Sequence, residues 1–166
     1  MTDEQNGADE INYVPEVTTI TAEVRQMLKG KRIGAIDFGQ KRVGFAVADE
    51  LHILASPRGV FPNNASLLDD LLRAFDNERL GGIIVGMPVK HDASESSWMR
   101  EIGAFILHLR ASTPLPVYVA DEAYSSRDAK QAMIQAGRKK QQRSQKGRTD
   151  EVAAAVILRE FLRELE

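Results

Sequence analysis

The stretch of sequence that decides the fold reads IGAIDFGQKRVGFAVAD over residues 33–49. Together with the residues up to Phe61 it contains three apolar, strand-like runs, at Ile33–Phe38, Val43–Asp49 and Ile53–Phe61. The separators Gly39-Gln40-Lys41 and Glu50-Leu51-His52 are short enough for β-hairpins. We therefore predict that the three strands pair in antiparallel fashion.

The pattern changes after Phe61, where apolar stripes of helical period alternate with short apolar runs. The stripes predict helices over Ala65–Glu78, Glu95–Ser112, Arg127–Ala136 and Thr149–Leu165. The short runs predict two further strands, at Ile83–Val85 and Val117–Ala120. Because parallel strands need crossover connections, which helices usually supply, these two strands should run parallel. The predicted fold class is α/β, with a five-stranded mixed sheet of three antiparallel and then two parallel strands, flanked by helices.

The first 30 residues differ from the rest in charge and in pattern. They contain six acidic and two basic residues, and residues 1–14 show no periodicity. We predict an acidic extension over residues 1–30 that is largely disordered, with room for a short helix over Thr18–Leu28. Residues 31–166 should form a single folded domain, because their number is ordinary for one domain.

Composition places the chain among soluble globular proteins. Hydrophobic residues make up 43% and charged residues 28% of the 166 residues, and cysteine is absent. The lack of cysteine excludes disulfides and thiolate zinc sites, and it is compatible with a reducing compartment. No apolar run approaches the roughly 18 residues that a membrane span needs, and the first residues do not resemble a secretory signal. We therefore expect a cytoplasmic protein with no membrane contact.

Positive charge is concentrated late in the chain, although the net charge is only −2. Residues 138–148 hold no acid and six basic residues, namely Arg138, Lys139, Lys140, Arg143, Lys146 and Arg148. Most of this stretch lies in a predicted loop over Gly137–Gly147, so its charges could simply be solvated. They could equally steer a polyanion such as nucleic acid, because the local field does so rather than the net charge. The sequence leaves both interpretations open.

Two acidic positions stand at strand ends. Asp37 ends the first strand on the same face as Ile33 and Ala35, and open α/β sheets usually bind ligands at strand ends. The alternative for Asp37 is a hairpin-turn residue. Asp121 and Glu122 follow the last strand, where their mutual repulsion favours a nearby cation. Alternation sends these two to opposite faces without deciding which one faces the site, and the alternative for the pair is helix capping.

A third acid, Asp150, lies on the apolar face of the last predicted helix. Its alternative is an acid that complements the helix dipole in the first turn, after Thr149 as the N-cap. The apolar stripe nevertheless directs Asp150 toward the sheet, and the small side chains of Ala153 and Ala154 would let the helix approach closely. If the acids of these three positions converge, Mg²⁺ or Mn²⁺ would suit them. Two such ions about 3.5–4 Å apart can hydrolyse a phosphodiester.

Several motifs carry a resemblance to a known family. They are Ala35–Ala46, Val85–Pro88, Ser94-Glu95, Val119–Glu122 and Thr149–Leu158. In combination they resemble the YqgF/RuvX family of ribonuclease H-like bacterial proteins, whose members are described as pre-16S rRNA nucleases and Holliday junction resolvases. The resemblance runs from about Lys31 to the C-terminus and leaves out the acidic extension.

The resemblance implies a ribonuclease H-like fold and a phosphodiesterase that depends on Mg²⁺ or Mn²⁺. On that basis Asp37, Glu122 and Asp150 would be the catalytic metal ligands, with Asp37 bridging two ions and the others holding one each. Nucleic-acid contacts would come from the six basic residues above and from Lys41, Arg42 and Lys90. Residues 123–126 read AYSS, where the family more often has an Arg-Leu-Thr-like continuation. The loss of that Arg removes a local ion pair or substrate contact, and it leaves the carboxylates intact.

We therefore predict a nuclease that cuts structured nucleic acid, with the 5′ end of the 16S rRNA precursor as the leading substrate, and that acts as a monomer or a homodimer. A Holliday junction resolvase acting on branched DNA is the nearest alternative, and symmetric incision would require two sites. A non-catalytic RNA-binding module would show strongly salt-dependent binding without turnover. An actin-like ATPase relative is disfavoured, because such proteins use two lobes and a longer chain.

Overall fold

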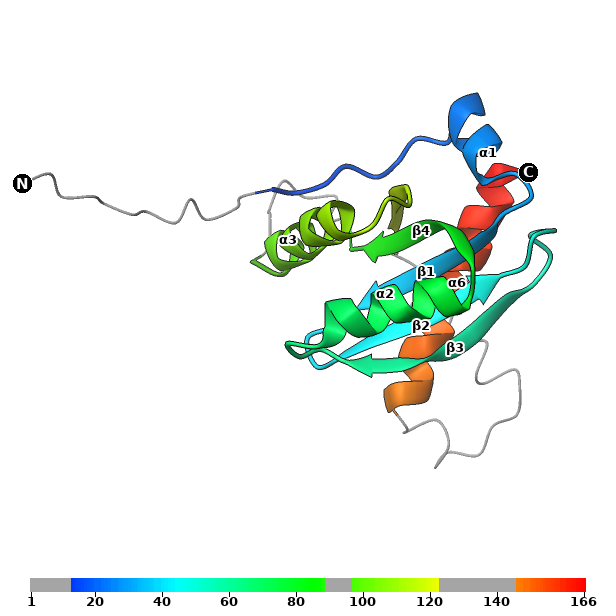
Figure 1. Cartoon of the computed structure of the whole chain (residues 1–166). Helices are drawn as coiled ribbons and strands as arrows, with labels where there is room; N and C mark the ends of the chain where they lie inside the picture. Colours follow the sequence, from blue (N-terminus) through cyan, green and yellow to red (C-terminus); the bar gives the residue numbers. More distant parts are fainter. Residues whose placement is uncertain (1–12, 89–96, 123–145) are drawn as a thin grey trace, which may run out of the picture.

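The computed structural model describes residues 13–88, 97–122 and 146–166, which form one five-stranded sheet with helices on both faces (Figure 1). The strands are β1 (Arg32–Phe38), β2 (Arg42–Ala48), β3 (Ala55–Pro62), β4 (Leu80–Met87) and β5 (Val117–Asp121). The helices are α1 (Ala22–Leu28), α2 (Leu67–Asn77), α3 (Ser97–Ser112) and α6 (Lys146–Leu165). Within these described ranges, no helix is both long and apolar enough to cross a bilayer.

The sheet has the strand order β3-β2-β1-β4-β5. The first three strands pair in antiparallel fashion through two hairpins, and β4 and β5 are added in parallel to β1. The predicted fold class is therefore confirmed. Since β1, β4 and β5 run in the same direction, their carboxyl ends meet at one edge of the sheet. This is the edge at which Asp37 and Glu122 lie.

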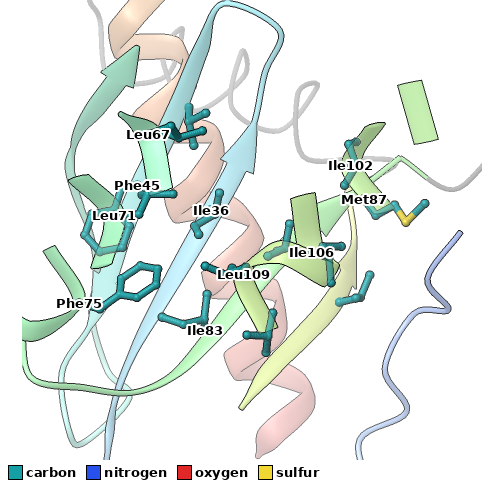
Figure 2. Packing of buried hydrophobic residues seen from close by; sticks show 14 of the residues in the cluster. Ile36, Phe45, Leu67, Leu71, Phe75, Ile83, Met87, Ile102, Ile106 and Leu109 are labelled. Carbon is teal, nitrogen blue, oxygen red and sulfur yellow. The ribbon is translucent and has the colours of Figure 1, made fainter. Parts of the chain in front are cut away.

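Each face of the sheet has its own apolar core. On one face Ile36 and Phe45 pack with Leu71 and Phe75 of α2 and with Ile106 of α3 (Figure 2). On the other face α6 covers mostly small side chains, and this second cluster includes Ala35, Ala46, Ala48, Ala120, Ala154 and Ala155. Small side chains on both sides of that interface let a helix axis lie close to the strands. The face beneath α6 is also the face that carries Asp37.

The segment before β1 pairs with β5, the outermost strand on one side of the sheet. The predicted helix over Thr18–Leu28 begins only at Ala22, because Thr21 is its N-cap and accepts a hydrogen bond from the Val24 amide at 3.3 Å. Thr18 lies in extended chain beside β5. Its amide donates to the Val119 carbonyl, and its hydroxyl accepts from the Val119 amide, each at 2.9 Å. A domain boundary after residue 30 stays a prediction, and residues 1–12 lie outside the described residues.

The last helix begins earlier than expected. Because α6 starts at Lys146, Thr149 lies inside the helix, so its interpretation as the N-cap was wrong. Lys146 and Arg148 belong to the first turn of α6 rather than to a loop. The predicted helix over Arg127–Ala136 and the rest of the basic stretch lie outside the described residues. Five predicted phosphate-binding residues also lie outside the described residues, namely Lys90, Arg138, Lys139, Lys140 and Arg143.

Candidate active site

Strand periodicity brings Asp37 and Glu122 to the same face of the sheet. Ala35 packs beneath α6, and Asp37, two residues later in β1, shares its side of the strand. Ala120 packs beneath α6 in the same way, so Glu122 follows on that side while Asp121 does not. The Glu122 amide donates to the Met87 carbonyl at 3.0 Å, which holds the end of β5 against β4. The sequence could not decide between the two acids, and the structure selects Glu122.

The carboxyl groups of Asp37 and Glu122 are hydrogen-bonded to each other. Burial, the charge of Asp37 and this hydrogen bond raise the pKa of Glu122 to about 9. Burial also raises the pKa of Asp37, and repulsion from Asp150 adds to it, while the hydrogen bond from Glu122 acts in the opposite direction. The proton therefore resides on Glu122, which donates to the Asp37 carboxylate. A cation bound near these two carboxyl groups would therefore stabilise their ionised forms.

Two glycines on the neighbouring strands make room for this pair. A Cβ atom at Gly86 of β4 would lie 3.0 Å from Glu122 Oε2 and 2.5 Å from Cδ1 of Ile157. A Cβ atom at Gly44, which is paired with Asp37 across the hairpin, would lie 2.1 Å from the Asp150 carbonyl oxygen. Gly86 thus leaves space for the Glu122 carboxyl group, and Gly44 lets the backbone of α6 approach the sheet. Sequence reasoning missed both residues.

Asp150 lies near the pair without joining it. Its charge contributes to the raised pKa of Asp37, so the two carboxyl groups are close enough to interact. Its Oδ2, however, accepts a hydrogen bond from Nε of Arg42 at 3.1 Å, and both side chains are about one-third exposed. Among the residues that the structure describes, no group of three or more His, Asp or Glu side chains is arranged to hold a metal ion. The structure therefore unites two of the three predicted ligands and pairs the third with Arg42.

The turn between β1 and β2 presents the remaining basic side chains at this edge. Lys41 is exposed at the turn, while Arg42 forms the ion pair with Asp150. The phosphate contacts of both residues stay predictions. Asn63 holds the turn through two hydrogen bonds. Its side-chain amide donates to the Gly39 carbonyl at 2.8 Å, and its backbone amide donates to the Lys41 carbonyl at 3.0 Å. Sequence reasoning missed Asn63, which lies just after β3 and far from the turn in sequence.

A divalent cation suits this set of side chains. Asp37 and Glu122 are hard oxygen donors of the kind that Mg²⁺ and Mn²⁺ prefer. A cation would replace the shared proton and offset the repulsion that Asp37 exerts on Glu122 and Asp150 exerts on Asp37. Asp150 could complete the set after a side-chain rotation that exchanges Arg42 for the ion. The donor chemistry therefore fits a divalent metal site.

A family model described as "RuvX: Holliday junction resolvase" matches residues 31–164. The chain belongs to the RuvX family. The residues before 31, including the Thr18 segment against β5, lie outside the matched range.

Relatives and solved structures agree with this assignment. A "Putative pre-16S rRNA nuclease" of Phocaeicola vulgatus is 42% identical over 132 residues, which are 79% of this chain and 94% of that protein. One of the same name from Chlorobium luteolum is 38% identical over 137 residues, covering 82% and 96%. Thermus thermophilus RuvC in complex with a Holliday junction substrate has a TM-score of 0.52 at 16% identity, covering 80% and 93%. At that identity the likeness shows the fold, which is that of RuvC.

Proposed function

We propose that this protein is a metal-dependent nuclease that hydrolyses phosphodiester bonds in structured nucleic acid, with the 5′ end of the 16S rRNA precursor as its substrate. The observation that carries the proposal is the partly buried Asp37–Glu122 pair: desolvation raises both pKa values, repulsion from Asp37 raises that of Glu122 further, and repulsion from Asp150 raises that of Asp37. A structural role alone would favour an apolar or neutral pair at this position, since burying two acids is costly. The names of the relatives from Phocaeicola and Chlorobium support the choice of substrate.

Asp37, Glu122 and Asp150 would hold the metal, which when bound supplies an activated water and stabilises charge on the leaving oxygen. Asp37 and Glu122 release their shared proton as they become ligands. Arg42 would position Asp150 beside the pair, through the ion pair of 3.1 Å between Arg42 Nε and Asp150 Oδ2, until that carboxylate becomes a metal ligand. Lys41 is exposed on the same turn, where its ammonium group can meet a phosphate oxygen of the substrate.

The first turn of α6 would contribute to the binding of nucleic acid. Lys146 and Arg148 lie there, at a helix N-terminus that also attracts phosphate, and only a few residues before Asp150. Together with the remaining basic residues predicted over 138–143 and with Lys90, they would form the phosphate-binding region. A cytoplasmic location follows from the proposed substrate, and a monomer or a homodimer is compatible with it.

The proposal is tested by incubating the purified protein with a precursor 16S rRNA, a single-stranded RNA and a four-way DNA junction in Mg²⁺ or Mn²⁺. Asp37→Asn and Glu122→Gln should lower the cleavage rate at least about 100-fold, the scale on which loss of one transition-state-stabilising group acts. Asp76→Asn, at an exposed position of α2, is the matched control and should cleave normally. Wild-type cleavage that survives in Asp37→Asn would contradict the proposed site. Cleavage of the junction alone would favour a resolvase, and salt-dependent binding without any product would favour a binding module.

A further inference from the structure

Three aromatic side chains gather behind the candidate active site. Phe38 follows Asp37 in β1 and therefore points to the opposite face of the sheet, toward α3. Its ring stacks on Phe105 with centroids 4.3 Å apart and on Trp98 with centroids 5.4 Å apart. All three side chains are only partly buried, although they pack against the core. Because the stack keeps part of its surface in solvent, a ligand can contact its outer ring, Trp98, from the solvent side.

An open hollow adjoins this stack. It has a volume of about 510 Å³, which is within the range of sites that take small ligands. Its described lining comprises Phe38, Gln40, Asn63, Trp98, Glu101 and Ala104. These residues come from β1, the β1–β2 turn, the chain after β3, and α3. The turn that carries Lys41 thus forms one wall of the hollow.

The described lining has the chemistry of a nucleobase site rather than of a phosphate site. A phosphate site needs cations or converging amide groups of the main chain, and no residue among the described lining is Lys or Arg. The hollow instead offers aromatic rings, the side-chain amide of Gln40, the side-chain oxygen of Asn63, and the carboxylate of Glu101. Rings stack on the π-face that every base has, while amides and a carboxylate hydrogen-bond to base edges. Glu101 would repel a phosphate, and its carboxylate would accept a hydrogen bond from an exocyclic amino group of a base.

We propose that this hollow binds one unpaired nucleobase of the substrate, stacked on Trp98, next to the phosphate that is cut. The inference rests on the proposed nuclease function and deepens it. Asp37 and Phe38 are consecutive and point to opposite faces of β1, so the sugar–phosphate chain would pass over the end of β1 between the two sites. A base held in this way cannot remain paired in a duplex, so the nucleotide beside the cleavage point must be single-stranded or flipped out.

Trp98 is the only tryptophan of the chain, so fluorescence excited selectively at tryptophan rather than at the three tyrosines reports on this hollow. The wild-type protein is titrated in EDTA, where no cleavage occurs, with a single-stranded RNA of ten nucleotides that carries the precursor's cleavage sequence. A second strand has the same backbone and lacks the bases at its four central positions. We expect saturable quenching by the first strand and little by the second. Equal quenching by the two strands would overturn the proposal, as would dye-reported binding of the first strand without quenching.

A variant series separates stacking from structural support. Trp98→Leu keeps an apolar side chain and removes the flat ring, whereas Trp98→Phe keeps a ring. Binding is followed by anisotropy of dye-labelled strands, with Leu51→Ser at the exposed β2–β3 turn as a control. Trp98→Leu should bind the base-containing strand about 5- to 150-fold more weakly, and the partly abasic strand as the wild type does. Trp98→Phe should restore most of the affinity. An equal loss on both strands would mean that Trp98 only supports the fold.

The two proposals fail in different ways. Base-dependent quenching without metal-dependent cleavage by the wild-type protein would retain the nucleobase site and end the nuclease proposal. Cleavage that depends on Asp37, with no difference between base-containing and partly abasic strands, would retain the nuclease and end the nucleobase site. The slope of affinity against salt should be unchanged in Trp98→Leu, because stacking releases no counterions.

Discussion

Replacing Gly86 by Ala tests whether the absence of a side chain at this position of β4 allows the Asp37–Glu122 pair to form. The added Cβ would lie 2.5 Å from Ile157 Cδ1 and 3.0 Å from Glu122 Oε2, and the first of these distances is far shorter than van der Waals contact. Ile157 is 2% exposed and cannot swing into solvent. Overpacking of this kind costs about 1–3 kcal/mol of folding free energy. The Glu122 carboxyl group must also shift, and displacements of up to about 1 Å can lower a rate by about 100-fold.

Stability and activity can be separated by removing one of the two clashes. Ile157→Val deletes the Cδ1 atom at a cost of about 0.5–1.5 kcal/mol by itself. In the Gly86→Ala, Ile157→Val double variant we expect most of the lost stability to return, as measured by urea unfolding. The contact with Glu122 Oε2 remains in that variant, so cleavage of the precursor RNA should stay about 10- to 100-fold below wild type.

Gly34→Ala is the matched control for this experiment. Gly34 is a buried glycine of β1, and its added Cβ would lie 2.6 Å from Leu80 Cδ1, on the face of the sheet away from the acids. It should therefore destabilise the protein to a similar degree and leave cleavage normal at temperatures where the variant is folded. If Gly86→Ala cleaves as fast as Gly34→Ala, the position of Glu122 over Gly86 is irrelevant to the activity.

Two further predictions concern pH and the segment before β1. Glu122 has an ordinary pKa of 4.5 that rises to about 9 in the folded protein, so in the metal-free wild type the stability that Glu122 contributes is fully present below pH 4.5 and is lost progressively up to about pH 9. Glu122→Gln cannot ionise, so with a chelator its advantage in thermal unfolding should grow across that window, and a constant difference would refute the assignment. Thr18→Val removes the acceptor of the Val119 amide and should lower the free energy of unfolding by about 1–3 kcal/mol. Thr19→Val, at an exposed neighbour, should change it little, and equal effects would show that the Thr18 contact is dispensable.

The fold could be predicted because its signals are local. Three apolar runs with short separators specify the hairpins, and the helical stripes after Phe61 specify crossovers and therefore parallel strands. The start of α6 was predicted incorrectly, because Thr149 followed by Asp150 has the pattern of an N-cap. The helix instead begins at Lys146. The segment before Ala22 was expected to be helical up to Thr18, since its apolar spacing could not reveal the hydrogen bonds to the distant Val119.

The site was only partly predictable, for a reason of geometry. The three acids could be proposed because each ends a strand or lies on an apolar helix face, but periodicity could not choose between Asp121 and Glu122. Gly44 carried a usable signal, because counting outward from the hairpin turn places it opposite Asp37. Gly86 carried none, since its relation to Glu122 depends on parallel pairing between distant segments, and the sequence does not specify that register.

The position of the acids in the sheet explains why such glycines are required. β1 has a neighbour on each side, so side chains on β2 and β4 beside Asp37 would fill the space around its carboxyl group, where the proposed metal and phosphate would bind. A central strand flanked by Gly44 and Gly86 gives burial together with space. The raised pKa of Glu122 and the close approach of α6 are therefore two results of the same arrangement, and a side chain at either glycine should disturb the site.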